Sequence, residues 1–211
     1  MNPVLEEISA LLQKGRAPLV KEAVQKAIDD GLGAGEILND GLMAGMGVIG
    51  TKFKNGEVFV PEVLIAARAM SAGIAVLQPL LTKDSVKSQG TVVLGTVKGD
   101  MHDIGKNLVK IMMEGKGLKV VDIGVDVDAE RFVEQAKENN AQIVACSSLL
   151  TTTMIEMKNV VEAVKAKGLN VKIMIGGAPV NDAFCKSIGA DKYAPDAASA
   201  AEAAVALCGA D

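Results

Sequence analysis

The only histidine of the chain, His102, lies between two aspartates in the segment GDMHDIGKN, residues 99–107. Glycines bracket this segment, and the apolar run TVVLGTV, residues 91–97, ends directly before it. An imidazole can act as a general acid or base or as a metal ligand, but a lone histidine is more often a surface residue or a hydrogen-bonded core residue. Which of these applies depends on the residues that the fold brings near it.

Several familiar site chemistries do not match this segment. It resembles a phosphate-binding loop, but its glycines enclose five residues instead of four, and Asn107 stands where Ser or Thr would bind magnesium. No GxSxG nucleophile elbow accompanies the histidine, and Cys146 and Ser147 occupy the place of the phosphorylatable aspartate of a receiver domain. One histidine without a nearby cysteine also disfavours a metal cage made of protein ligands alone. A single imidazole can, however, be the axial ligand of a metal that a macrocycle already holds.

Composition and charge limit the class of protein. The 211 residues are enough for one large domain or two small ones. The net charge of −4, without a basic cluster, argues against nucleic acid or an anionic membrane as a partner. The first residues, MNPVLEEISALLQKG, do not resemble a signal peptide, and no uninterrupted apolar run approaches the ~18 residues of a membrane span. Three scattered cysteines without CxxC spacing are typical of free thiols in a reducing compartment and predict a cytoplasmic protein; they are Cys146, Cys185 and Cys208.

The amino-terminal part of the chain, residues 1–82, has the periodicity of helices throughout. Apolar residues recur at helical spacing in four segments, which predicts a four-helix bundle over residues 4–14, 17–31, 36–52 and 61–82. One apolar stripe of the fourth segment is expected to face the core, and it consists of Val60, Val63, Leu64, Ala67, Met70, Ile74, Leu77 and Leu81. The polar stretch KDSVKSQG, residues 83–90, is predicted to be a linker.

From residue 91 to residue 211 the pattern alternates between strands and helices. Near-continuous apolar runs predict five strands, at 91–97, 119–124, 142–148, 171–177 and near DKYA. Such runs indicate a parallel sheet that helices cover on both faces. Right-handed crossovers then favour an α/β fold with a doubly wound, flavodoxin-like sheet in the order 2-1-3-4-5.

A doubly wound sheet binds its ligand at the carboxyl ends of its strands, where the strand order reverses. In the predicted order, this crevice is lined by the loops after the first, third and fourth strands. These loops are GDMHDIG, SSLLTTT at residues 147–153, and GGAPV at residues 176–180. The first holds the sole histidine, the second is rich in small hydroxyls, and the third has two glycines that let a ligand approach the backbone.

These three loops carry, in order, the motifs of cobalamin-binding domains. Residues 100–105 match DxHxxG, residues 147–149 match SxL, and residues 176–177 match GG. In the helical part, FKNGEVFVPEVLIAAR, residues 53–68, resembles the cap domain that precedes such modules. Over nearly its whole length the chain therefore resembles the corrinoid proteins of methanol, methylamine and methoxy-aromatic methyltransferase systems, which are related to the cobalamin-binding module of methionine synthase.

The resemblance implies a role for each residue that matches a motif. His102 would be the lower axial ligand to cobalt in cobalamin or a related corrinoid, whose benzimidazole tail is displaced from the metal. Asp100 would hydrogen-bond the other ring nitrogen, and Thr153 would end the relay at a position where Ser is often found. Ser147 would hydrogen-bond the benzimidazole, and Gly105 would let the chain pass the nucleotide tail. The other residues implied to contact the cofactor are Met101, Asp103, Ile104, Leu149, Thr151, Gly176, Gly177, Ala178, Tyr193 and Ala194.

The resemblance also implies that the helical part is a cap. Phe53, Val60 and Val63 match positions where the family places apolar groups over the upper face of the cobalt. An apolar cover would exclude water and oxygen and so suppress side reactions. The same apolar stripe is also what a bundle core without any cofactor would show.

The implied activity is methyl transfer, with the hard chemistry supplied by the cofactor. Co(I) takes a methyl group from a substrate held by a donor-specific methyltransferase. The resulting methylcobalamin passes it to a thiol or tetrahydrofolate-type acceptor on a second methyltransferase, and a reductive activating protein is a further implied partner. The chain would be a carrier subunit that is not catalytic without its partners, and the linker at 83–90 would be its hinge.

Other functions stay open on the sequence alone. An adenosylcobalamin-dependent mutase subunit shares the carboxyl-terminal motifs, but the FVPEV segment is not expected before them. A cobalamin-dependent sensor and transcription regulator also has a helical bundle, but it needs a DNA-binding domain and characteristically a Trp and a His in that bundle, and this chain has no Trp and no second His. A flavodoxin-type domain that binds another small ligand is the alternative without a corrinoid, and visible absorption of the purified protein would separate it from the rest.

Overall fold

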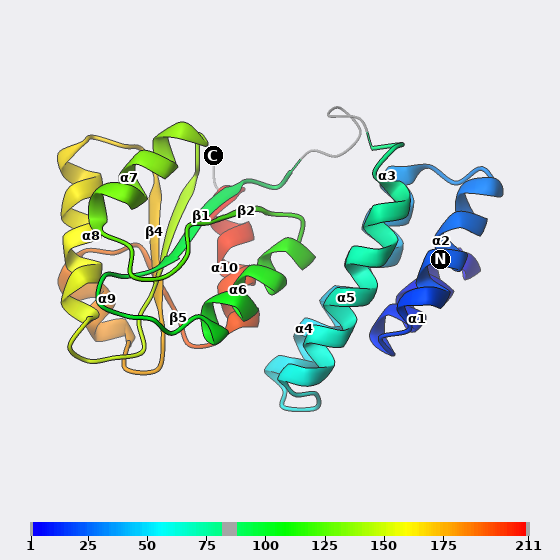
Figure 1. The fold of residues 1–211 in the computed structure, drawn as a ribbon, viewed down its shortest axis with the longest axis horizontal. Helices are drawn as coiled ribbons and strands as arrows, with labels where there is room; N and C mark the ends of the chain where they lie inside the picture. Colours follow the sequence, from blue (N-terminus) through cyan, green and yellow to red (C-terminus); the bar gives the residue numbers. More distant parts are fainter. Residues whose placement is uncertain (1, 82–87, 210–211) are drawn as a thin grey trace. The chain divides into compact units, whose positions relative to one another are not determined.

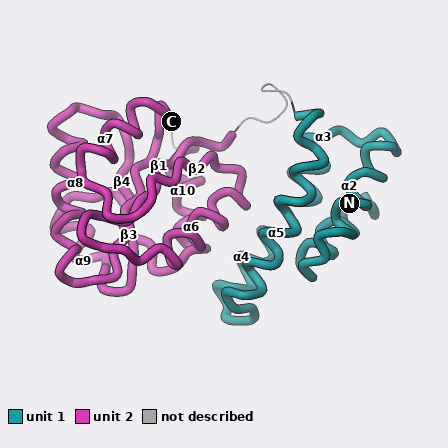
Figure 2. The backbone as a smooth tube through the Cα atoms, viewed as in Figure 1, with its two compact units in different colours: residues 1–87 teal, residues 88–211 magenta. Residues whose placement is uncertain are grey.

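The chain divides into two units, Met1–Lys87 and Ser88–Asp211, which Figure 2 shows in different colours. The structure is a computed structural model that describes residues 2–81 and 88–209. Residues 83–87 of the predicted linker lie outside the described residues. Each unit has its own core and is described by itself.

The unit Ser88–Asp211 is built on a five-stranded parallel sheet in the order β2-β1-β3-β4-β5 (Figure 1). This order confirms the predicted doubly wound sheet. The strands are β1 (Thr91–Thr96), β2 (Lys119–Asp122), β3 (Ile143–Ser147), β4 (Lys172–Gly176) and β5 (Lys192–Ala194).

Helices cover both faces of this sheet. On one face α6 packs against α10, and on the other α7 packs against α8, with α9 beside α8 (Figure 1). Capping side chains start three of these helices, because Asp128, Asn181 and Asp196 each accept a backbone N–H from the first turn. The helices are α6 (Ile104–Gly115), α7 (Ala129–Glu138), α8 (Met154–Ala166), α9 (Asp182–Ile188) and α10 (Ala197–Cys208).

The core of this unit is mainly aliphatic, and Phe132 is fully buried beside β1. Gly95 in β1 makes room for that ring, because a Cβ on Gly95 would lie 2.8 Å from the ring of Phe132. The residues of β1 from Val92 to Thr96 are buried, as expected for a central strand covered on both faces. The histidine segment begins at Gly99, three residues after the last residue of β1.

The unit Met1–Lys87 is helical, as predicted, but its helix boundaries differ. The predicted helix 36–52 begins two residues earlier and includes a seven-residue π-helical stretch. Periodicity at 3.6 residues does not distinguish a π-helical turn from an α-helical one. The elements are α1 (Pro3–Gln13), α2 (Ala17–Asp29), α3 (Ala34–Glu36), the π-helix η1 (Ile37–Met43), α4 (Ala44–Lys54) and α5 (Val60–Leu77).

The predicted apolar stripe of α5 is partly wrong. Leu64 was expected in the core, but its side chain is 47% exposed. The buried face runs instead through small residues such as Ala66 and Gly73, and a Cβ on Gly73 would lie 2.7 Å from the side chain of Leu42. The predicted Val63, Met70 and Leu77 are buried on this face as well. Small residues let helices approach closely, so hydrophobicity alone finds only part of the buried face.

Helix α5 is also the one helix among the described residues whose length and composition would let it cross a membrane. This is weak evidence for a span, because the core helix of a soluble protein passes the same test. Helix α2 packs along α5, and the side chains of Val63 and Leu77 are fully buried. These contacts place one face of α5 in the core of the helical unit.

Candidate functional site

The carboxyl ends of the central strands bring the three predicted loops together. In the sheet, Ser147 at the end of β3 lies between Thr96 of β1 and Gly176 of β4. The loops that follow these strands therefore start level with one another at one edge of the sheet. This is the edge where a doubly wound sheet places its ligand.

His102 and Asp100 form a hydrogen-bonded pair in the first of these loops. Nδ1 of His102 lies 2.7 Å from Oδ1 of Asp100, and the backbone N–H of His102 donates to the same oxygen at 3.0 Å. The Asp100 side chain is fully buried, whereas the His102 side chain is 51% exposed. One nitrogen of the ring is thus fixed to a buried carboxylate while the ring itself remains at the surface.

The second oxygen of Asp100 binds the loop after β3. Oδ2 accepts the backbone N–H of Leu149 at 2.7 Å and of Leu150 at 3.3 Å. The Thr153 hydroxyl lies 3.1 Å from Oδ2, so the expected link between Asp100 and Thr153 is present. Ser148, which the sequence did not single out, lies 2.8 Å from the Thr153 hydroxyl and 3.4 Å from Oδ2. The carboxylate therefore joins the histidine loop to the loop after β3.

The hydrogen bonds around Asp100 decide its charge. Burial by itself would raise the pKa of the Asp100 carboxyl. The backbone N–H and ring of His102, the backbone N–H of Leu149 and the Thr153 hydroxyl outweigh burial and hold this pKa well below its usual value of 3.8. An ionised carboxylate can only accept hydrogen bonds, so the proton between the two side chains belongs to Nδ1. In the neutral imidazole the lone pair is then on Nε2, and a lone pair is what a metal ligand needs.

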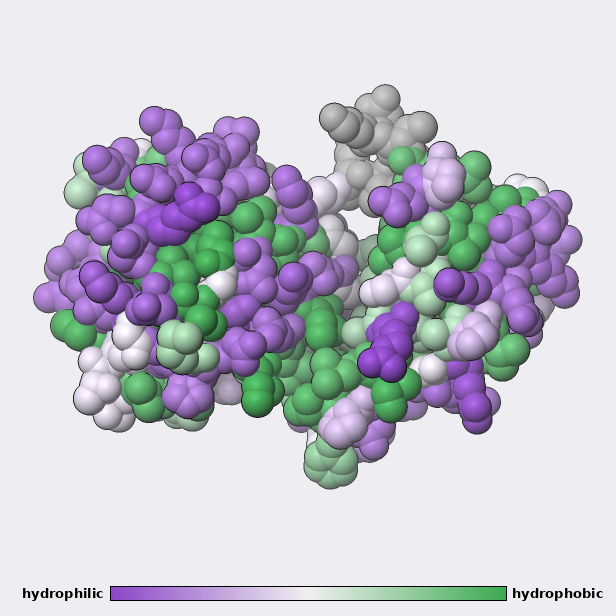
Figure 3. Space-filling view, in the orientation of Figure 1, coloured by the Kyte–Doolittle hydropathy of each residue, from purple (hydrophilic) through white to green (hydrophobic). Residues whose placement is uncertain are grey.

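Exposed apolar side chains lie on the loops that carry the imidazole and hold its carboxylate partner. Figure 3 shows apolar surface in green on the unit that carries the site. Within the described part of Ser88–Asp211, every large apolar side chain that is exposed belongs to the histidine segment, to the loop after β3 or to the first turn of α8; these are Met101, Ile104, Leu149, Leu150 and Ile155. Exposed apolar side chains that lie close together mark a binding surface more often than they mark a surface without a partner.

The glycines of the motifs differ in whether the packing of the protein itself requires a residue without a side chain. A Cβ on Gly105 would meet no protein atom within 4 Å, so protein packing does not require glycine there. Gly177 has φ +129°, and its Cβ would lie 1.8 Å from the Ser148 carbonyl oxygen. Gly177 is therefore needed for the contact between two loops of the protein. From the sequence alone, this glycine was instead explained by the approach of a ligand. A Cβ on Gly176 would lie 3.2 Å from the Ala194 carbonyl oxygen.

The remaining predicted residues of this unit lie at the same sheet edge or on β5. Asp103 begins α6 and its side chain accepts an N–H of Asn107 at 3.2 Å. Ser147 is half-buried, whereas Thr151 and Ala178 are exposed.

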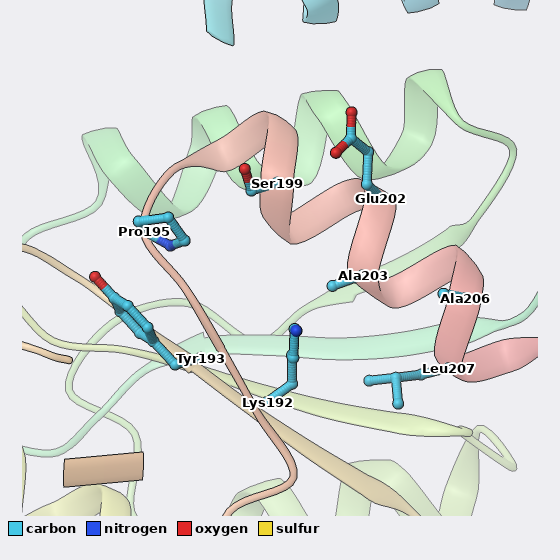
Figure 4. A pocket seen from close by; sticks show the side chains of 8 residues that line it. All are labelled: Lys192, Tyr193, Pro195, Ser199, Glu202, Ala203, Ala206 and Leu207. Atoms are coloured by element: carbon cyan, nitrogen blue, oxygen red, sulfur yellow. The ribbon is translucent and has the colours of Figure 1, made fainter. Parts of the chain in front are cut away.

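Tyr193 lines a separate groove of about 390 Å³ between β5 and α10 (Figure 4). Ala194, the next residue of β5, is buried. The lining residues of the groove are Lys192, Tyr193, Pro195, Ser199, Glu202, Ala203, Ala206 and Leu207, and none belongs to the three motif loops.

The predicted cap residues lie in the helical unit. Phe53 is near the end of α4 and Val60 is the first residue of α5, and both are half-buried. Val63 is fully buried, so its side chain is a core residue of the structure. Phe59, which the sequence reasoning did not select, is 67% exposed immediately before α5.

Two residues that hold the histidine loop were missed from the sequence. The buried Thr96 hydroxyl donates to the carbonyl oxygen of His102 at 2.9 Å. Asp126, in the loop after β2, accepts the backbone N–H of Gly99 at 2.7 Å. Neither could be found from motif spacing, because Thr96 is inside a strand and the loop after β2 does not line the predicted crevice.

Comparison with known proteins gives consistent matches over both units. Residues 90–205 match the family described as B12 binding domain, and residues 4–78 match a second family with the same description. A corrinoid protein of Desulfitobacterium hafniense is 41% identical over 211 residues, covering 98% of each chain. Dimethylamine corrinoid protein 1 of Methanosarcina acetivorans is 44% identical over 200 residues, covering 93% of each chain. Among solved structures, the methanol:cobalamin methyltransferase complex of Methanosarcina barkeri matches with a TM-score of 0.91 and 31% identity, covering 100% of this chain and 81% of the other.

Proposed function

Because this chain belongs to the family of corrinoid proteins with B12 binding domains, we propose that it is a cobalamin-dependent methyl carrier. It receives a methyl group from a donor-specific methyltransferase and delivers it to a thiol or tetrahydrofolate-type acceptor through a second methyltransferase. The relatives named as methylamine corrinoid proteins and the methanol:cobalamin methyltransferase complex support this assignment. When bound, the corrinoid supplies a cobalt centre that takes up and releases the methyl group.

One observation carries the proposal: a half-exposed imidazole with a free Nε2 stands within a group of exposed apolar side chains. The two faces of a corrin ring are largely apolar around one central metal, so a single neutral nitrogen ligand beside apolar side chains suits it. The open space beyond Gly105 leaves room for a ligand to pass the start of α6. The residues present therefore fit the cofactor.

The residues of the chain act mainly by holding and orienting. Asp100 keeps the proton on Nδ1 of His102, which makes Nε2 the ligand and raises its basicity. Thr153 and the loop after β3 hold Asp100 in turn. Met101 and Ile104 are exposed in the protein without cofactor, and their apolar side chains would exclude water beside the corrinoid when it is bound.

The helical unit is proposed to protect the reduced cofactor. Phe53 and Val60 keep exposed surface and are the candidates for this role, whereas the buried Val63 contributes to the core. A reduced corrinoid reacts with oxygen and protons, so an apolar cover would preserve it between transfers. A reductive activating protein is the third proposed partner, and the proposed location is the cytoplasm.

The axial ligand can be tested with an isotope, because the chain has one histidine. Tag-free protein labelled only with ¹⁵N-histidine is loaded with cobalamin and reduced to Co(II), and its electron paramagnetic resonance spectrum is recorded. We expect the axial-nitrogen splitting to change from a triplet to a doublet on labelling and to disappear in His102→Ala. Lys98→Ala, an exposed change immediately before the histidine segment, is the matched control and should behave as the native protein. An axial-nitrogen splitting that stays a triplet after ¹⁵N labelling would show that the nitrogen comes from the cofactor's own base.

The carrier role needs a separate measurement. The reduced, loaded protein is mixed with a methylamine or methanol methyltransferase of the same organism and its substrate, and methylation of the bound cofactor is followed by visible absorption. We expect one methyl group per bound corrinoid. Normal cobalamin binding without methylation by any of these enzymes would contradict the carrier role and leave the binding assignment intact.

A further inference from the structure

Asp126 holds the histidine segment from the loop between β2 and α7. Oδ1 of Asp126 accepts the backbone N–H of Gly99 at 2.7 Å. The backbone N–H of Asp126 donates to the carbonyl oxygen of Asp100 at 3.0 Å. One residue thus binds both Gly99 and Asp100, and one residue, Met101, separates this pair from His102.

The backbone of Asp126 is itself held in an uncommon conformation. Its φ is +54°, in the left-handed region that residues other than glycine rarely occupy. Asp and Asn tolerate this region best among the residues with side chains. The next residue, Val127, is fixed by a bridge to Val97, and its backbone N–H donates to the carbonyl oxygen of Thr96. A strained residue persists where neighbouring contacts over-determine it, and such places concentrate at functional sites.

The segment that Asp126 holds needs external support. Gly99 has φ +79° and is exposed. Because glycine adopts many backbone conformations at little cost, Gly99 does not by itself fix the course of the segment. Yet the next residue, Asp100, must place one oxygen at the His102 ring and the other at the backbone N–H of Leu149. A small shift of the Asp100 backbone would lengthen several of these hydrogen bonds at once.

We propose that Asp126 is a positioning residue for the histidine loop. It fixes Gly99 and Asp100 by two hydrogen bonds and thereby holds the His102 ring in the orientation that leaves Nε2 free. The effect on the loop follows from the protein alone, whereas the consequence for cobalt ligation rests on the proposed function.

Three substitutions separate the hydrogen bond from the backbone conformation. Asp126→Asn keeps an oxygen acceptor and a side chain that tolerates the left-handed region. Asp126→Gly keeps the conformation but removes the acceptor, and Asp126→Ala removes the acceptor and adds strain. Asp128→Gly is the matched control, since Asp128 lies in the same loop but its side chain caps α7 through Arg131.

The first readout uses the protein without cofactor. Hydrogen exchange of the Gly99 amide, measured by nuclear magnetic resonance, should be about tenfold faster or more in Asp126→Gly, because a charge-assisted hydrogen bond is lost. Asp126→Asn, which keeps a neutral oxygen acceptor, should exchange at a rate between those of the native protein and Asp126→Gly, and Asp128→Gly should stay within about twofold of the native rate. Native exchange of Gly99 in both the Gly and Ala variants would overturn the proposal.

The second readout uses the cobalamin-loaded protein. Asp126→Gly should bind cobalamin about tenfold more weakly, as loss of a residue that supports a metal ligand typically does, and a smaller fraction of its Co(II) form should show the histidine splitting. Asp126→Asn should restore both the cobalamin affinity and the fraction of the Co(II) form that shows the histidine splitting. Faster Gly99 exchange with native affinity and native splitting would overturn the positioning role. If the native protein itself bound no cobalamin, the proposed function would fail, and the exchange result would still decide whether Asp126 holds the loop.

Discussion

Asp100 is the residue on which the chemistry of the site depends. Its carboxylate is fully buried, and all of its hydrogen bonds come from donors in two loops. Because it can only accept, it determines which nitrogen of His102 carries the proton. A site of this kind is sensitive to changes that preserve shape but exchange an acceptor for a donor.

Asp100→Asn tests that sensitivity. The new amide can donate to Nδ1 of His102, which would move the ring proton to Nε2 and block the ligand position. We expect the variant to bind corrinoid but to lose most of the axial-nitrogen splitting of the Co(II) form, as a histidine in the wrong tautomer would. Asp103→Asn, at an exposed position of the same segment, should keep the native splitting. Native splitting in Asp100→Asn would show that the carboxylate does not set the tautomer.

The pH dependence of stability gives a second test of Asp100. Its folded-state pKa lies below the usual 3.8, so its ionised form stabilises the folded protein above that pH, and this contribution is lost as the pH falls through and below 3.8. We expect the free energy of unfolding of the native protein to fall between pH values of about 4 and 2 by roughly 2 kcal/mol more than that of Asp100→Asn. Urea unfolding at a series of pH values measures both. Parallel curves for the two proteins would contradict the assignment.

At the scale of elements, a Gly→Ala substitution in each of two motifs distinguishes a glycine that leaves space for the cofactor from one that the protein's own packing requires. Gly105 lies in α6 with open space where a Cβ would point, so Gly105→Ala should keep or raise the free energy of unfolding by about 0.5–1 kcal/mol. Its cobalamin affinity should fall, because the methyl group would occupy space proposed for the cofactor. Gly177→Ala should instead destabilise the protein without cofactor by more than about 2 kcal/mol, since its Cβ meets the Ser148 carbonyl. Urea unfolding and cobalamin titration are the measurements, and native affinity in Gly105→Ala would remove that residue from the site.

The start of α6 is also anchored by a buried ion pair. Lys106 is 3% exposed, and its Nζ lies 2.6 Å from Oδ1 of Asp122 at the end of β2. Burial would raise the pKa of Asp122, but the ammonium group of Lys106 holds it low. Lys106→Met would leave that carboxylate without its main partner and should lower the free energy of unfolding by about 2–3 kcal/mol. Lys110→Met, whose side chain is more exposed, should lower it by less than about 1 kcal/mol in the same urea titrations.

The sequence was most informative about elements whose signal is local. The strands, their order and the three crevice loops follow from apolar runs and right-handed crossovers, and the link from Asp100 to Thr153 followed from the family resemblance. Asp126 and Ser148 could not be found in this way, because their contacts come from tertiary packing between loops and have no fixed spacing. The core face of α5 was misjudged for a similar reason, since Ala66 and Gly73 pack there because they are small.

At the scale of the whole molecule, the two units divide the work of the proposed carrier. The unit Ser88–Asp211 contains the histidine, the carboxylate and the apolar surround, and residues 90–205 match the B12 binding family. The unit Met1–Lys87 has its own core and its own family match over residues 4–78. Retention of the cofactor is therefore expected to depend on the unit Ser88–Asp211, and protection of the reduced cofactor on the helical unit Met1–Lys87.

Protection by the helical unit makes a prediction that a purely structural role does not. The double variant Phe53→Ala and Val60→Ala removes apolar groups that are only half-buried, so it should keep most of the fold and bind cobalamin normally. Oxidation of its reduced cofactor in aerated buffer, followed by stopped-flow absorbance, should be severalfold faster than in the native protein. Val63→Ala is the matched control: it truncates a fully buried side chain and should lower the free energy of unfolding by about 2 kcal/mol with a native oxidation rate. Unchanged oxidation in the double variant, with only a lower thermal midpoint, would mean that these side chains serve the bundle core and that something else protects the metal.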